Sequence, residues 1–224
     1  MIERPSPNHG PRHAGLPVDM LVLHYTGMRD AAAALERLTD PAAAVSAHYL
    51  IDEDGTTVRL VPEERRAWHA GVASWRGVSD VNGRSVGIEL VNPGHEHGYR
   101  AFPKRQMTAL LQLAAGILTR HPIPPRNVVG HSDVAPARKL DPGELFDWQT
   151  LAQAGIGLWP KRLPVSAEVA AIPQMLRDYG YDPEQPGVMI AFQRHFRPSR
   201  IDGIGDNECA RILAALLESV EPGR

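Results

Sequence analysis

Short apolar runs in the first part of the chain predict buried strands. Val18 to Leu23 is such a run, and it ends at His24, so this strand would deliver a histidine side chain at its C-terminal edge. Val86 to Val91 is a second run, with Glu89 as the one charged residue inside it. Val128 and Val129 predict a last short strand before Gly130. These strands would form a central sheet.

Helical periodicity is clearest over residues 103–121. The apolar side chains there follow the i, i+3, i+4, i+7 spacing of one buried face: Met107, Leu110, Leu111, Ala114, Ile117 and Leu118. Shorter helices are predicted over residues 30–38, with Asp30 as the N-cap, and over residues 147–154. A hairpin is predicted where β-prone stretches flank Glu53-Asp54-Gly55. Together the elements predict an α/β (α+β) fold, with helices packed on a central sheet.

The composition changes after Ala154. Residues 155–165 are rich in Gly and Pro and have no clear period, so they are interpreted as a linker. Helical patterns near residues 167–178, 186–196 and 206–218 then predict a small all-α unit. The expected organisation is a main domain over residues 1–154, a linker over 155–165 and a three-helix domain over 166–224.

Composition narrows the chemistry further. The 224 residues are 43% hydrophobic and 22% charged with a formal net charge of -2, which is typical of a globular protein and makes nucleic acid an unexpected partner. Cys209 is the single cysteine, so the chain can form neither an internal disulfide nor a thiolate zinc cluster. Any bound metal must be held by histidines and carboxylates.

The N-terminal stretch from Met1 to Pro17 is polar and lacks the apolar core of a signal peptide. No window approaches the roughly 20 apolar residues that cross a bilayer, and no lipidation cysteine lies near the start. A cytoplasmic location is therefore expected; a leader removed from the sequence would instead indicate the periplasm.

Several polar residues lie where a hydrolytic metal site would need them. Such a site takes about three protein ligands and leaves one position open for water. His24 ends a strand, and His131 and Asp141 lie at the two ends of one loop. Taken alone, a histidine at a strand end is more often structural, and the chain has ten histidines. Glu89 must either point to solvent or lie half-buried beside a cation, and Lys139 is either a cation aimed at an oxyanion or a solvated lysine.

Five segments occur in an order that carries a family resemblance. They are Val22-Leu23-His24-Tyr25-Thr26, residues 45–51, the run Arg66-Ala67-Trp68-His69-Ala70-Gly71, the strand at Glu89, and the loop from Gly130 to Gly143 with its pattern His-Ser-Asp-x-Ala-Pro-x-Arg-Lys-x-Asp-Pro-Gly. Over residues 18–149 the chain resembles the N-acetylmuramoyl-L-alanine amidases of the AmpD/AmiD type, in the superfamily that includes phage T7 lysozyme and the peptidoglycan recognition proteins.

The resemblance implies a central mixed sheet flanked by helices and a zinc site. It places His24, His131 and Asp141 on the three ligand positions, Glu89 on the catalytic carboxylate and Lys139 on the conserved cation of the active site. It also implies that Trp68, His69 and Arg138 line the substrate groove, while His48 is either a groove residue or a buried structural histidine. The implied substrate is a muropeptide or peptidoglycan.

The C-terminal helical patterns have a resemblance of their own. Residues 176–181, 191–196 and 201–203 resemble the three-helix peptidoglycan-binding module that is often attached to amidases. The alternative is a structural cap that packs on the main domain without touching wall polymer.

Three functions fit this resemblance: an amidase, a recognition protein that binds without cleaving, and a lysin that attacks intact wall. Purely recognising relatives typically lack a complete ligand set, so Asp141 together with Glu89 favours catalysis. The expected reaction is cleavage of the amide between N-acetylmuramic acid, or its 1,6-anhydro form, and L-alanine.

Overall fold

The computed structural model describes residues 1–13 and 15–220. Its strands are β1 Ile2–Glu3, β2 His9–Pro11, β3 Met20–Tyr25, β4 Tyr49–Ile51, β5 Thr57–Arg59, β6 Arg65–Ala67, β7 Ser85–Leu90 and β8 Val128–Gly130. Its α-helices are α1 Ala31–Thr39, α2 Val81–Arg84, α3 Gly94–His97, α4 Lys104–Arg120, α5 His131–Val134, α6 Trp148–Gln153, α7 Ile172–Tyr179, α8 Val188–Phe196 and α9 Asn207–Val220. Within the described part of the chain, no helix has the length and apolar character that crossing a membrane requires.

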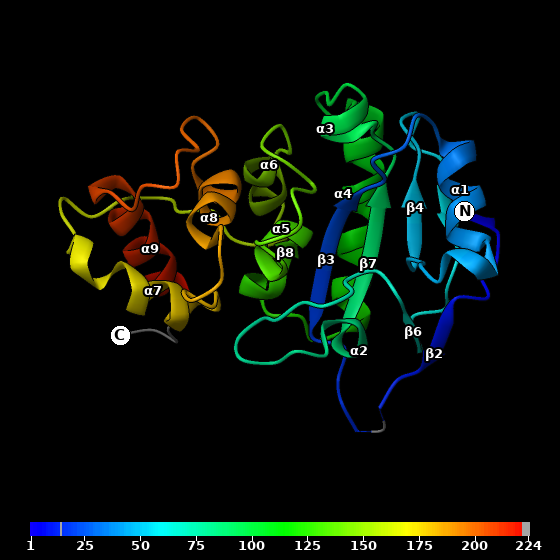
Figure 1. Cartoon of the computed structure of the whole chain (residues 1–224), viewed down its shortest axis with the longest axis horizontal. Coiled ribbons are helices and arrows are strands. Elements are labelled where there is room, and N and C mark those ends of the chain that lie inside the picture. Colours follow the sequence, from blue (N-terminus) through cyan, green and yellow to red (C-terminus); the bar gives the residue numbers. More distant parts are fainter. Residues whose placement is uncertain (14, 221–224) are drawn as a thin grey trace.

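A six-stranded mixed sheet organises the molecule, in the order β1-β5-β4-β7-β3-β8 (Figure 1). β3 is parallel to both of its neighbours, β7 and β8, and β4 is parallel to β7. β4 and β5 pair antiparallel and form the predicted hairpin. A separate antiparallel pair joins β2 to β6. The sheet is therefore mixed and flanked by helices, which confirms the expected fold class.

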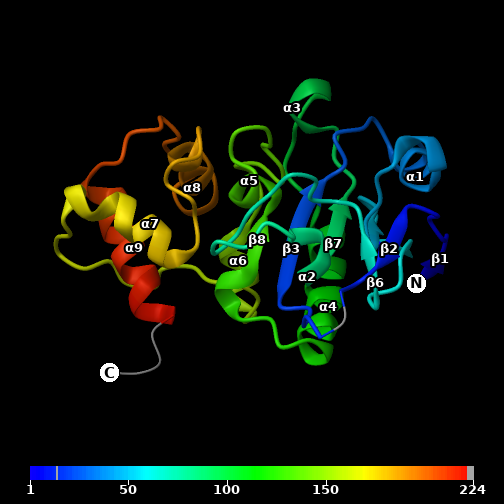
Figure 2. The same cartoon turned by 60° about the horizontal axis from the view of Figure 1, so that its bottom comes forward.

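The alternation of side chains along the strands separates two cores. Leu21 and Leu23 of β3 point to the face covered by α4, where they join Leu110, Ala114 and Ile117. Met20 and Val22 point to the opposite face, as does His24 because side chains alternate along a strand. Figure 2 shows α4 behind strands β3 and β7. His24 therefore lies on the face of the sheet that α4 does not cover.

Two predicted helix starts are confirmed by their caps. The Asp30 side chain accepts a hydrogen bond from the backbone N–H of Ala33, and the Asp147 side chain accepts one from Thr150. Each cap satisfies a backbone donor that the first turn of a helix leaves unpaired. The first C-terminal helix, by contrast, begins at Ile172 and not near residue 167, because Pro173 can occupy only the first turn of a helix.

The C-terminal helices α7, α8 and α9 pack on the sheet rather than standing apart. Their buried residues Leu176, Phe192 and Leu213 belong to the same apolar cluster as Val22 and Val129 of the sheet. Trp75, in the loop before α2, packs edge-on against Tyr179 and Tyr181 within this cluster. A continuous core therefore joins the C-terminal helices to the face of the sheet that carries His24.

Candidate active site

Parallel pairing of β3 with β7 brings the first two candidate residues together. In the register of these strands His24 lies opposite Glu89. β8 is the other neighbour of β3 and leads directly into α5, whose first residue is His131. The loop after α5 returns so that the carbonyl of Asp141 accepts a hydrogen bond from the Ser132 N–H at 2.9 Å. The fold thus gathers residues from three separate parts of the chain at one edge of the sheet.

Three potential ligand atoms converge there. His24 Nδ1 lies 2.9 Å from His131 Nδ1 and 3.1 Å from Asp141 Oδ2, and His131 Nδ1 lies 3.0 Å from Asp141 Oδ2. All three side chains are buried, and among residues 1–13 and 15–220 no other group of three or more His, Cys, Asp and Glu side chains converges in this way. Tetrahedral ligands about 2.0–2.1 Å from a zinc ion lie roughly 3.3 Å apart, so the spacing is close to that of a metal site.

A directed chain of hydrogen bonds sets the tautomer of His24. The Ser85 hydroxyl donates to the carbonyl of Val81 at 2.6 Å, so its oxygen accepts from Nε2 of His69 at 3.0 Å. His69 Nδ1 is then unprotonated and accepts from Nε2 of His24 at 3.0 Å. Nδ1 of His24 is left with a free lone pair directed toward His131 and Asp141.

His131 is held in the same tautomer by the backbone. Its Nε2 donates to the carbonyl of Ala70 at 3.0 Å, and this carbonyl also accepts from the Arg138 guanidinium. Arg138 donates further to the carbonyl of Val72. The Nδ1 lone pair of His131 therefore faces that of His24, an arrangement that is repulsive unless a cation lies between the two nitrogens.

The protonation states suit a cation. Burial lowers the pKa of His24 to about 4, and the neighbouring His131 acts in the same direction. Burial alone would raise the pKa of Asp141, but His131 and His24 hold it well below its ordinary value. Two imidazoles and one carboxylate are a donor set that binds divalent metals, and these three residues could hold one.

Glu89 lies beside this group without being part of it. Its Oε2 atom is buried and has no hydrogen-bond partner among the described residues. Burial raises the pKa of Glu89 well above its ordinary value, and the charge of Asp141 raises it further, while Lys139 opposes the shift. A carboxyl with a raised pKa can both accept and donate a proton near neutral pH.

A pocket of about 370 Å³ opens over these residues. Glu89, His131 and Asp141 line it together with Lys139, the predicted active-site cation, and the predicted groove residues Trp68, His69 and Arg138. Its volume lies in the range of roughly 300–1,000 Å³ that holds small ligands. The structure therefore brings the sequence-predicted residues to one cavity, with His24 buried directly behind it.

His48 differs from the other predicted groove residues. It is fully buried and does not line the pocket. Its Nδ1 accepts from the Gly87 N–H at 2.9 Å, and its Nε2 lies 3.0 Å from the Arg65 carbonyl. Burial, with the nearby charge of Arg12, lowers its pKa to about 3. These contacts favour the structural alternative for His48.

Ser85 and Gly87 support the site in a way that the sequence interpretation missed. Both lie on the Glu89 side of β7, and a Cβ atom on Gly87 would lie 2.5 Å from Cγ of His69. The absence of a side chain at Gly87 lets the His69 ring lie against the sheet and reach Ser85. The period-two pattern Ser85, Gly87, Glu89 was the signal that could have found them.

Comparisons with known proteins agree with this geometry. Residues 14–144 match the family model described as N-acetylmuramoyl-L-alanine amidase. The chain is 41% identical to the N-acetylmuramoyl-L-alanine amidase AmiD of Escherichia coli K12, in an alignment that covers 90% of this chain and 83% of that protein. The family match extends over strands β3 to β8 and over the loop of His131 and Asp141.

Solved structures show the same likeness. The structure of E. coli AmiD in complex with anhydro-N-acetylmuramic acid-L-Ala-D-gamma-Glu-L-Lys superposes with a TM-score of 0.81 at 40% identity, covering 93% of this chain and 92% of that one. AmpDH3 of Pseudomonas aeruginosa in complex with anhydromuramic pentapeptide gives a TM-score of 0.82 at 38% identity, covering 92% and 94%. The fold and the site define a hydrolase of the amidase type. The chain belongs to the N-acetylmuramoyl-L-alanine amidase family.

Proposed function

We propose that the protein is a zinc-dependent N-acetylmuramoyl-L-alanine amidase that acts on muropeptides in peptidoglycan recycling or turnover. The bond cleaved is the amide between L-alanine and N-acetylmuramic acid or its 1,6-anhydro form. The proposal rests above all on Glu89 Oε2, which is buried without a hydrogen-bond partner among residues 1–13 and 15–220 and lies beside three converging ligand atoms.

His24, His131 and Asp141 would hold the zinc ion. Their two imidazoles and one carboxylate match a three-ligand hydrolytic site with one further position open. When bound in such a site, zinc supplies Lewis acidity toward water and toward a carbonyl oxygen. His69 and the carbonyl of Ala70 accept from Nε2 of His24 and His131, so both rings are turned with Nδ1 toward the metal position.

Glu89 would move the proton in the reaction. Its carboxylate accepts a proton from the attacking water, and the carboxyl then gives that proton to the alanine nitrogen as the C–N bond breaks. Lys139, on the same pocket wall, stabilises the negative charge that develops on the carbonyl oxygen. Trp68 and Arg138 line the remainder of the groove, where they would contact the sugar and the peptide.

Support for anhydro-muropeptides comes from the relatives. AmiD and AmpDH3 were solved with anhydromuramic peptides, and both align with more than nine tenths of this chain. The complete ligand set with Glu89 argues against recognition without cleavage.

The division of the chain is also proposed: a catalytic domain over residues 1–154, a linker over 155–165 and a peptidoglycan-binding-like domain over 166–224. Three packed helices, α7 to α9, support the last part. The cytoplasmic location expected from the sequence stays a prediction, which fractionation of producing cells would test.

Mass spectrometry of digests tests the proposed reaction. The zinc-loaded protein is incubated with a purified anhydro-muropeptide, and release of free peptide and anhydro-N-acetylmuramic acid is expected. Removal of the metal with a chelator should stop the release, and added zinc should restore it. Intact sacculi serve as the second substrate; faster release from sacculi than from the soluble fragment would favour a lysin. An uncut amide in both substrates at full zinc occupancy would contradict the proposal.

A further inference from the structure

Helix α8 contacts the loop that carries two of the three metal-ligand candidates. This loop, residues 130–144, contains His131 and Asp141 and is called the metal loop below. In Figures 1 and 2 α8 lies beside α5, the first turn of the metal loop, while α7 and α9 lie farther from the sheet. The C-terminal helices thus meet the candidate active site through α8.

The first contact is at Asp133, two residues after His131. The buried Asp133 carboxylate accepts the Gly130 N–H through Oδ2 at 2.7 Å and so closes the turn from which His131 projects. The same Oδ2 accepts from Nδ1 of His195 in α8 at 2.7 Å, and Oδ1 accepts from the Tyr181 hydroxyl at 2.7 Å. Tyr181 and His195 therefore both bond to the Asp133 carboxylate, which in turn closes the first turn of the metal loop.

Stacking fixes the plane of the His195 ring. It stacks between Trp148 and Phe196, with ring centroids 3.8 Å away on either side and interplanar angles of 18° and 7°. Its Nε2 is buried and has no hydrogen-bond partner in the described part of the chain. The hydrogen bond from Nδ1 to Asp133 is therefore the one polar contact of this ring within the described residues.

Two further contacts reach the middle and the end of the metal loop. Gly187, just before α8, has a φ of +80°, and a Cβ there would lie 2.9 Å from the Pro136 carbonyl oxygen. Nε of Arg194 lies 3.6 Å from Oε2 of Glu144. Gly187 and α8 therefore contact the metal loop at three places, namely Pro136, Asp133 and Glu144. These contacts fix the position of α8 relative to the metal loop.

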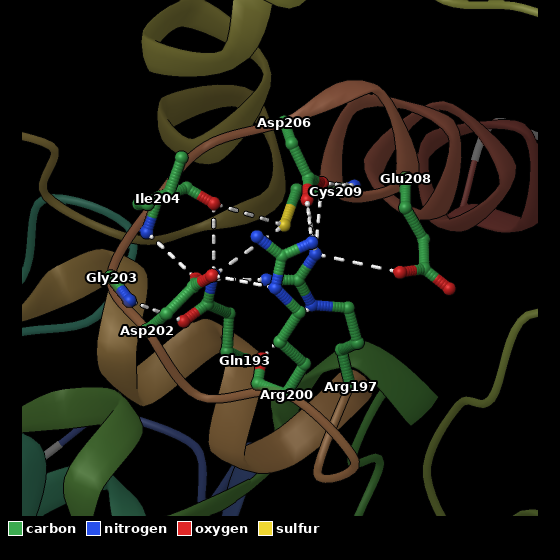
Figure 3. Close-up of polar contacts among 9 residues, drawn as sticks. All are labelled: Gln193, Arg197, Arg200, Asp202, Gly203, Ile204, Asp206, Glu208 and Cys209. Carbon is green, nitrogen blue, oxygen red and sulfur yellow. Dashed lines mark hydrogen bonds and ion pairs between the residues drawn. The ribbon is translucent and has the colours of Figure 1, made fainter.

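The opposite side of α8 is anchored within the C-terminal helices (Figure 3). Gln193 Oε1 accepts from the Gly203 N–H at 2.7 Å, and its Nε2 donates to the Ile204 carbonyl at 2.9 Å. The buried Arg197 guanidinium donates to both carboxylate oxygens of Asp206 at 2.8 and 2.7 Å. This network ties α8 to the chain leading into α9, so that Arg194 and His195 are presented from a fixed helix.

We propose that the C-terminal helices position the metal site, with Tyr181 and His195 acting through Asp133 as positioning residues. They hold the metal loop so that His131 and Asp141 present their ligand atoms together with His24. The inference rests on the proposed function, because it requires that these three residues bind zinc. Neither Tyr181 nor His195 touches the pocket, so their effect is on the geometry of the ligands.

Single substitutions in the full chain can remove the hydrogen bonds to Asp133 while leaving the packing of the buried rings nearly unchanged. Tyr181→Phe removes one hydroxyl, and His195→Phe keeps a ring in the stack but removes the donor to Asp133. His195→Asn returns an N–H near the position of Nδ1. Tyr179→Phe is the matched control, since Tyr179 is also buried in the aromatic cluster but its hydroxyl donates to none of the described residues.

The readout is the zinc dissociation constant, measured by competition with a chelator, together with the visible spectrum of the cobalt-substituted protein. Tyr181→Phe and His195→Phe should each weaken zinc binding by about tenfold and change the cobalt spectrum. His195→Asn should recover most of the affinity, and Tyr179→Phe should match wild type.

The outcomes separate the two proposals. If wild type binds zinc, and Tyr181→Phe and His195→Phe bind it with unchanged affinity and an unchanged cobalt spectrum, the positioning role is wrong, whatever their melting temperatures. If wild type binds no zinc, the proposed function itself fails. Should His195→Phe not fold, Tyr181→Phe, which removes a single oxygen atom, decides the test by itself.

Discussion

His69 Nδ1 lies 3.0 Å from His24 Nε2, on the side of the His24 ring away from the ligand atoms. Because His69 is held in turn by Ser85, this contact keeps the proton on Nε2 and leaves Nδ1 free for a metal. His69→Ala should therefore weaken zinc binding by about 10–100-fold. Chelator competition measures this, with the exposed His13→Ala as control. Equal affinities in His69→Ala and wild type would show that His69 does not orient the ligand.

Substitutions at Gly87 and His69 should have non-additive effects on the free energy of unfolding. A methyl group on Gly87 would meet the His69 ring at 2.5 Å, so Gly87→Ala is expected to destabilise the protein by about 1–3 kcal/mol. In a His69→Ala background the same substitution should cost much less, because the obstructing ring is gone. Urea unfolding of the four proteins of this cycle gives the coupling. Additive free energies would contradict the close approach.

Glu63 should make stability depend on acid pH. Burial alone would raise the pKa of Glu63, but hydrogen bonds from Arg120, Tyr49 and His121 lower it to about 2 from its ordinary 4.5. The stabilisation is thus complete above pH 4.5 and is lost as the pH falls toward 2.

Glu63→Gln should accordingly lower the free energy of unfolding by about 1–2 kcal/mol at pH 7, allowing for screening by solvent. The difference from wild type should shrink steadily below pH 4.5. Denaturant unfolding across this range measures it, and Glu64→Gln, at an exposed neighbouring position, is the control. A difference that stays constant down to pH 2 would refute the assignment.

Replacement of Lys139 should lower kcat more than it changes the binding of substrate. Replacing it with Met removes the positive charge that we propose stabilises the developing oxyanion, so kcat on an anhydro-muropeptide should fall by about 10²–10³-fold. KM should change much less. Lys161→Met, at an exposed position after α6, should leave both constants unchanged. A rise in KM with an unchanged kcat would instead assign Lys139 to substrate binding.

Local patterns predicted the elements that carry the site. The run before His24 and the position of Glu89 inside an apolar strand placed both residues on strands of the sheet. The ordered motifs pointed to His131 and Asp141 as metal-ligand candidates, and the structure brings both beside His24. The family, the fold class, the hairpin and the long helix α4 are confirmed. Each of these features could be predicted because its periodicity or motif lies within one short segment of the chain.

Contacts between distant segments could not be predicted in this way. The bonds from Asp133 to Tyr181 and His195 join residues 48 and 62 positions apart, and no local pattern encodes them. Strands β2 and β6 have three residues each, too few to show an alternating apolar pattern in the sequence. They form because they pair with each other. The register that sets His24 opposite Glu89 likewise depends on parallel pairing across the fold.

Glu89→Gln tests the proton-transfer role most directly, because the amide fills the same space but cannot accept the proton of the attacking water. With zinc occupancy equal to wild type, kcat on a purified anhydro-muropeptide should fall by about 10²–10⁴-fold. Glu36→Gln, on the exposed side of α1, should retain wild-type activity. A zinc-loaded Glu89→Gln protein that releases the peptide at the wild-type rate would contradict the account.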